Sequence, residues 1–159
     1  MADHQKVLAS IAVATDPAKL RSLRENAQRL GVREVDEAAF RRLVEILPED
    51  APGSIEHDFW KTIHAFEEVL RDERGKTVRL SRTRQKIGRV GVMATLIDFA
   101  LIRKPTDGFN MLIERGLPQL TGEALVLKHS SHFEPPVLEA AKSRLEGAGV
   151  DISKLWPQT

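Results

Sequence analysis

The residues with the clearest chemical bias form one basic stretch near the middle of the chain. Residues 76–89 contain six Lys or Arg residues and no acidic residue, and residues 76–104 contain eight against one acid, Asp98. Lys and Arg neutralise phosphates and release counterions, while hydroxyls and helix N-terminal amides donate hydrogen bonds to phosphate oxygens. The expected contact residues are Arg79, Ser81, Arg82, Thr83, Arg84, Lys86 and Arg89.

This stretch predicts a non-catalytic protein that binds nucleic acid, with DNA favoured over RNA. Ser81 or Thr83 is expected to cap a short helix, which would place the free amides and the cations at one end. In the opposing interpretation, the cations form a solvated face or pair with acids of the preceding helix, namely Glu67, Glu68, Asp72 and Glu73. The chain would then be a protein-interaction module or accessory subunit that binds another protein or a second copy of itself, with Leu155-Trp156 and the apolar helix 92–103 as its surfaces.

Three other groups of residues could carry catalytic or metal chemistry, and each lacks part of what that chemistry needs. His57, His64 and Glu68 share a helix but do not have the His-Glu-x-x-His spacing of zinc hydrolases. The run His129-Ser130-Ser131-His132 lacks an orienting acid and an oxyanion hole. Asp107, Glu123 and Lys128 have the residue types of a magnesium nuclease, without its usual spacing. No catalytic residue, metal or cofactor is therefore predicted, although a site built from distant residues stays open.

Composition excludes several classes of protein. The chain has no cysteine, which excludes disulfides and cysteine-ligated zinc and fits a cytoplasmic location. No run of roughly 18–20 apolar residues is present, so no membrane span is expected. The net charge is only +1, but residues 1–74 hold 11 basic and 15 acidic residues, and residues 75–159 hold 13 and 8. This asymmetry suggests a face that prefers polyanions, or two halves that attract each other.

The elements that must position these residues are predicted to be helices. Caps, glycines and prolines divide the chain into helices at about 3–14, 17–30, 33–47 and 55–74, then 82–90, 92–103, 107–115, 123–128 and 135–145. Gly91 separates two of them, and the apolar run 124–127 could instead be a short strand.

The predicted fold class is all-α, with an N-terminal helical hairpin plus a long helix, followed by a compact bundle of short helices. The loop 48–54 and the segment 75–81 are the candidate boundaries. An acidic unit 1–74 and a basic unit 75–159 are favoured, although one continuous domain would also fit. The succession of short helices in the second half looks like part of a bacterial helical accessory protein.

Overall fold

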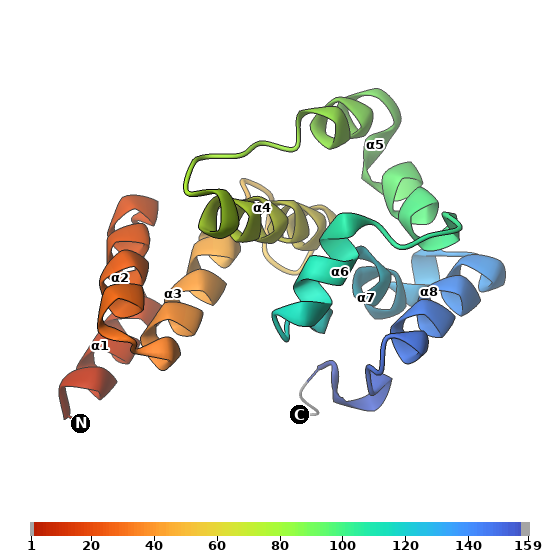
Figure 1. The fold of residues 1–159 in the computed structure, drawn as a ribbon. Coiled ribbons are helices and arrows are strands. Elements are labelled where there is room, and N and C mark those ends of the chain that lie inside the picture. Colours follow the sequence, from red (N-terminus) through yellow and green to blue (C-terminus); the bar gives the residue numbers. More distant parts are fainter. Residues whose placement is uncertain (1, 157–159) are drawn as a thin grey trace. The chain divides into compact units, whose positions relative to one another are not determined.

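The computed structural model describes residues 2–156, which form eight α-helices and three short 3-10 helices without any strand (Figure 1). The predicted all-α class is confirmed, and a helical hairpin, a long helix and a bundle follow one another as expected. The chain divides into two compact units, Met1–Glu49 and Asp50–Thr159. Each unit has its own apolar core.

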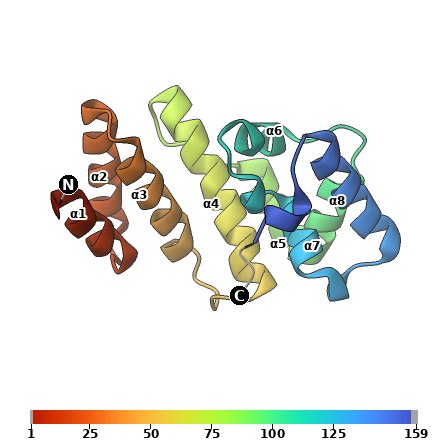
Figure 2. The same cartoon turned by 90° about the horizontal axis from the view of Figure 1, so that it is seen from below.

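The first unit contains α1 (Ala2–Ala12), α2 (Pro17–Leu30) and α3 (Arg33–Ile46) (Figure 2). Asp16 caps α2 by accepting a hydrogen bond of 3.0 Å from the amide of Ala18, and Pro17 occupies the first turn, where no amide is needed. Gly31 ends α2 with a φ of 72°, a conformation that disfavours residues with a Cβ. This sharp ending allows α2 and α3 to pack as a hairpin, against which α1 also packs.

The second unit contains α4 (Ile55–Arg74), α5 (Ser81–Leu101), α6 (Asp107–Glu114), α7 (Gly122–Lys128) and α8 (Pro135–Gly147). Its 3-10 helices are η1 (Pro118–Leu120), η2 (Ser130–His132) and η3 (Ile152–Lys154). The short helix α7 is central, because residues 122–126 are all buried and α7 contacts α4, α5 and α8. Thr121 caps α7 through the amide of Ala124 at 3.1 Å, so the apolar run 124–127 is helical and not a strand.

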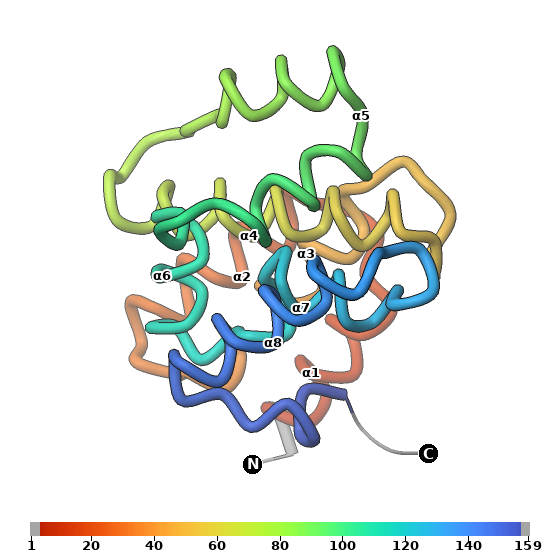
Figure 3. The backbone as a smooth tube through the Cα atoms, turned by 90° about the vertical axis from the view of Figure 1, so that its right-hand side faces the viewer, coloured from red at the N-terminus to blue at the C-terminus, as the bar shows by residue number. Residues whose placement is uncertain are grey.

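Helix α5 consists of two halves separated at Gly91, as the sequence predicted. Gly91 has a φ of 88° and a ψ of 169°, which no residue inside an α-helix adopts. Figure 3 shows the tube of α5 turning at this point, so that the first half runs in a different direction from the second. The two halves, 81–90 and 92–101, can therefore face different surroundings.

Two further features concern the ends of the second unit. Leu155 is buried in a cluster with Phe109 and Leu145, and Trp156 packs against it, so this pair of residues docks on its own unit. The long helix α4 packs against α6 and α7, and the division of the chain lies between residues 49 and 50. The favoured boundary after residue 74 therefore differs from the structure, because the apolar stripe of α4 is part of the second core.

Burial predicts which leucines of the second unit support its stability. Leu145→Ala should lower the free energy of unfolding by about 3 kcal/mol, because it empties a fully buried site. Leu101→Ala is the matched control: its side chain is 53% exposed, and the expected change is within about 0.5 kcal/mol. Urea denaturation followed by circular dichroism measures both values, and equal losses would contradict this packing.

Candidate nucleic-acid interface

The first half of α5 is amphipathic in a way that separates its cations into two groups. Leu80, Thr83, Arg84 and Ile87 recur at helical spacing and are partly or fully buried. Ile87 belongs to the main core of the second unit. The opposite side of the helix is exposed and carries Ser81, Arg82, Gln85, Gly88 and Arg89. Arg79, in the irregular segment just before the helix, is exposed as well.

A single carboxylate holds the start of this half-helix. Glu67 of α4 accepts a hydrogen bond from the amide of Leu80 at 2.8 Å. It also accepts two from Arg84, from Nε at 2.8 Å and from Nη2 at 2.6 Å. The Arg84 guanidinium lies 5.2 Å from the ring centre of Trp60, which adds a cation–π contact. Arg84 is thus partly buried and paired within the chain.

This contact changes the predicted cap. Leu80 is the N-cap residue of α5 and no side-chain hydroxyl caps the helix, so neither Ser81 nor Thr83 has the predicted role. The negative group beside the helix N-terminus is a carboxylate of the chain itself, in the place where a phosphate was expected. The opposing interpretation, in which the cations pair with acids of the preceding helix, is correct for Arg84.

The environment of Glu67 also sets its acidity. Burial by itself would raise the pKa of Glu67, but the hydrogen bonds from Arg84 and the Leu80 amide outweigh burial and hold the pKa below its ordinary value. In turn, the hydrogen bonds to Glu67 raise the pKa of Arg84. Both groups are therefore charged at neutral pH, and their attraction stabilises the folded chain.

Lys86 is also engaged within the chain. Its Nζ lies 2.5 Å from Oδ2 of Asp98, which belongs to the second half of α5. The ion pair spans the break at Gly91 and links the two halves. Because both side chains are substantially exposed, the pair contributes little to stability, and Lys86 can exchange this partner for another anion.

The remaining predicted residues divide by position. Arg79, Ser81, Arg82 and Arg89 are exposed, and no acidic residue occurs between positions 75 and 97. Thr83 lies on the inner side of the half-helix and lines a cavity (described below). Of the seven predicted residues, the structure therefore gathers four on the outside, keeps Arg84 and Thr83 on the inside, and leaves Lys86 between them.

A second polar cluster joins α4 to the segment at the end of α7. Asp58, near the start of α4, is buried, and its Oδ2 lies 2.8 Å from His129 Nε2 and 2.9 Å from Lys128 Nζ. Burial alone would raise the pKa of Asp58, yet the hydrogen bonds from His129 and Lys128 hold it below its ordinary value. Local sequence patterns could not predict this cluster, because 71 residues separate Asp58 from His129.

The arrangement of this cluster fits a structural role better than a catalytic one. Lys128 at the C-terminal end of α7 and Asp58 in the first turn of α4 each suit the adjacent helix dipole, and their ion pair connects the two helix ends. The three residues with the types of a magnesium nuclease have different surroundings. Asp107 is exposed, Glu123 is buried 3.5 Å from Arg144, and Lys128 pairs with Asp58. Within the part of the chain that the structure describes, no three acidic or histidine side chains converge as metal ligands.

The low pKa of Glu67 predicts how pH and mutation change stability. Its ordinary value is 4.5, and the folded value is lower, so its contribution is complete above about pH 4.5 and is lost as pH falls through the folded value. Glu67→Gln should therefore cost about 2 kcal/mol at pH 7 and progressively less as the pH falls below 4.5. The matched control on the same helix, Glu73→Gln, removes a half-exposed carboxylate and should change little. Urea titrations at several pH values measure both, and a pH-independent loss would contradict this role.

Comparison with known proteins adds no family to this picture. No protein-family model matches the chain, and neither a curated protein nor a solved structure does so. Every helix among residues 2–156 is too short or too polar to cross a lipid bilayer. The function proposed below is inferred from the exposed face of the first half of α5 and from the contacts that hold it.

Proposed function

We propose that this protein binds the phosphate backbone of a nucleic acid through the outer side of the first half of α5. The observation that carries the proposal is the exposure of Arg79, Arg82 and Arg89 on a stretch that contains no acid from position 75 to position 97. Exposed arginines of this kind neutralise phosphates and donate two hydrogen bonds to them. We call these three residues the basic face.

The spacing of the basic face suits a nucleic-acid strand. Arg82 and Arg89 are seven residues apart on one helical stripe, which corresponds to about 10 Å along the helix axis. This separation lets the two guanidinium groups contact different phosphates of one strand, with Arg79 reaching a further one.

Rigid attachment favours this use of the half-helix. Glu67 fixes its first turn through Leu80 and Arg84, and Ile87 anchors its far end in the core. Positioning by such buried contacts reduces the entropy that is lost when the exposed arginines bind a ligand. Arg84 thus contributes to binding as a positioning residue, through Glu67, and touches no phosphate itself.

DNA is favoured over RNA for a reason of shape. A single α-helix with its side chains is about 10–12 Å wide, which matches the roughly 12 Å major groove of B-DNA. The major groove of A-form RNA is too narrow to admit it. Gln85 is exposed between Arg82 and Arg89, so an amide capable of reading a base edge lies in the middle of the face.

A triple substitution tests the basic face. Arg79, Arg82 and Arg89 changed together to Ala should reduce the slope of log affinity against log salt by about 2–3, because each phosphate contact contributes about 0.9. The measurement is fluorescence anisotropy with labelled duplex DNA, duplex RNA and single strands across a salt series. Tighter binding of duplex RNA would overturn the preference for DNA.

A control with the same change in net charge separates local contact from general attraction. Lys19, Arg41 and Lys142 are exposed cations outside α5, and their change to Ala should leave the slope nearly intact. Equal slopes for the two triple variants would refute the basic face, as would an absence of binding by the original chain at low salt. The unfolding temperature of both variants should stay close to that of the original chain, since none of these six residues is buried.

The alternative proposal, an accessory subunit that binds another protein or a second copy, is favoured by one observation. Leu101 and Ile102 are adjacent, about half exposed, and lie at the end of α5. The Leu155-Trp156 pair, by contrast, is packed on its own core. If this surface mediates self-association, light scattering should give a multiple of the chain mass that falls to one chain when Leu101 and Ile102 are changed to Ser. A monomer at high concentration would exclude self-association through it.

A further inference from the structure

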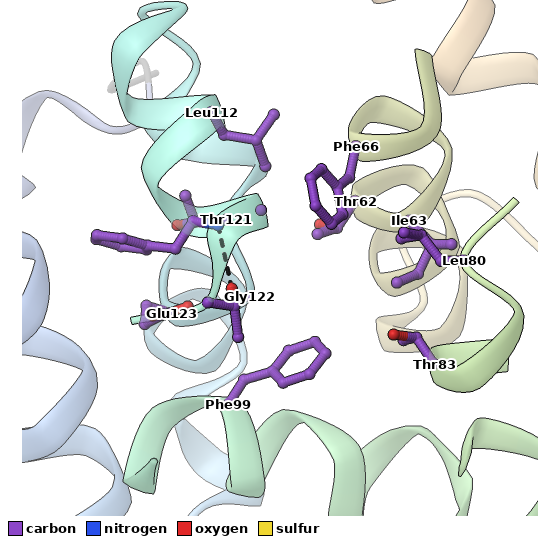
Figure 4. A pocket seen from close by; sticks show the side chains of 13 residues that line it. Thr62, Ile63, Phe66, Leu80, Thr83, Phe99, Leu112, Thr121, Gly122 and Glu123 are labelled. Carbon is purple, nitrogen blue, oxygen red and sulfur yellow. Dashed lines mark hydrogen bonds between the residues drawn. The ribbon is translucent and has the colours of Figure 1, made fainter. Parts of the chain in front are cut away.

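A cavity of about 80 Å³ lies within the second unit, under the first half of α5, and is partly open to solvent (Figure 4). Thr62, Ile63 and Phe66 of α4 form one wall. The beginnings of α6 and α7 form the opposite wall, and Leu80, Thr83 and Phe99 of the α5 region line it as well. The lining is mostly hydrocarbon, and all of it belongs to one compact unit.

Two aromatic rings of the lining contact the backbone at glycines that line the cavity as well. A Cβ at Gly108 would lie 2.9 Å from the ring of Phe66, so this ring rests directly on the backbone of α6. A Cβ at Gly122 would lie 3.1 Å from the ring of Phe99, which is also stacked on Phe59 with ring centres 6.2 Å apart. Displacing either ring would lose these contacts, so both rings are fixed in the lining.

The polar groups of the lining are mostly committed within the chain. Thr62 donates a hydrogen bond to the carbonyl of Asp58, Thr106 accepts one from the amide of Phe109, and Thr121 makes two. Among the described residues, the hydroxyl of Thr83 has no hydrogen-bond partner. Thr83 is therefore the threonine of the lining whose hydroxyl can form a hydrogen bond with a bound molecule.

Charge also restricts the occupant. Among the described residues that line the cavity, Glu123 is the only ionisable one. Its Oε2 lies 3.5 Å from Arg144 without a hydrogen bond, and burial raises the pKa of this carboxyl. None of the described lining residues is a cation that could balance an anion, and burial disfavours any further unpaired charge. An uncharged molecule therefore loses the least solvation free energy when it enters this cavity.

We propose that this cavity is a binding site for a small uncharged molecule, largely hydrocarbon, whose single hydroxyl or carbonyl group hydrogen-bonds to Thr83. A closed apolar cavity of about 150 Å³ holds benzene, so about half that volume suits an occupant of roughly four heavy atoms. The closest chemical class is a short branched alcohol or ketone. This proposal does not depend on nucleic-acid binding, because the occupant touches the inner side of the half-helix and not the basic face.

The experiment is a titration of the full chain with 2-propanol, followed by methyl resonances in two-dimensional NMR. The methyl groups of Ile63, Leu80 and Leu112 line the cavity and should shift in a saturable way. Leu145 and Leu43 are buried outside it and should not shift. Acetate, which has the same number of heavy atoms and a negative charge, should produce no saturable shift.

Variants of Thr83 locate the site. Thr83→Val keeps the shape and removes the hydroxyl, and should weaken 2-propanol binding about fivefold. Thr83→Phe should fill the space and abolish binding, whereas Gln85→Phe, on the exposed side of the same half-helix, should leave it unchanged. If Thr83→Phe fails to fold, Gly108→Ala provides a second block, because its Cβ displaces the Phe66 ring.

Two results would overturn the proposal. One is a set of lining methyl shifts that rises linearly with 2-propanol without saturation. The other is saturable binding that survives in a folded Thr83→Phe or Gly108→Ala chain, since the occupant would then lie elsewhere.

Discussion

The carboxylate of Glu67 is the contact on which the arrangement of the second unit's surface depends. It receives three N–H groups, one from the backbone at Leu80 and two from Arg84. Without it, the irregular segment 77–80 and the first half of α5 would lose their main polar attachment to α4, and a partly buried guanidinium would be left without its carboxylate. The interaction therefore determines which side of the half-helix faces inward and which cations remain outside.

The break at Gly91 is the second constraint, and it acts together with the first. A continuous helix from 81 to 101 would keep both halves in line, whereas the positive φ of Gly91 lets the first half follow Glu67 while the second packs against α7 and α8. Arg144 secures the end of the second half by donating to the carbonyls of Phe99 and Ile102. Both halves contribute to the lining of the cavity, with Thr83 from the first and Phe99 from the second. The break at Gly91 thus lets the two halves reach one cavity although they run in different directions.

Other ion pairs of the second unit also connect the ends of helices. Asp58 ties the start of α4 to the end of α7 through Lys128 and His129, and Arg115 reaches Asp72 near the end of α4. These contacts connect the long helix to the short helices around it. They also explain the use of histidines and acids that, by residue type alone, resemble the parts of a catalytic or metal site.

The sequence by itself determined the all-α class, most helix ends and the break in α5, because capping side chains, prolines and glycines act over a few residues. Ser54, Thr106 and Thr121 cap the helices predicted for them. The sequence could also show that the basic stretch exists, but not which cations stay exposed. Only the tertiary structure decided that Arg84 faces Glu67 and Thr83 faces a cavity, and that the long helix belongs to the second unit. Such pairings join residues that are distant along the chain, and their energies depend on burial and direction, which local patterns do not contain.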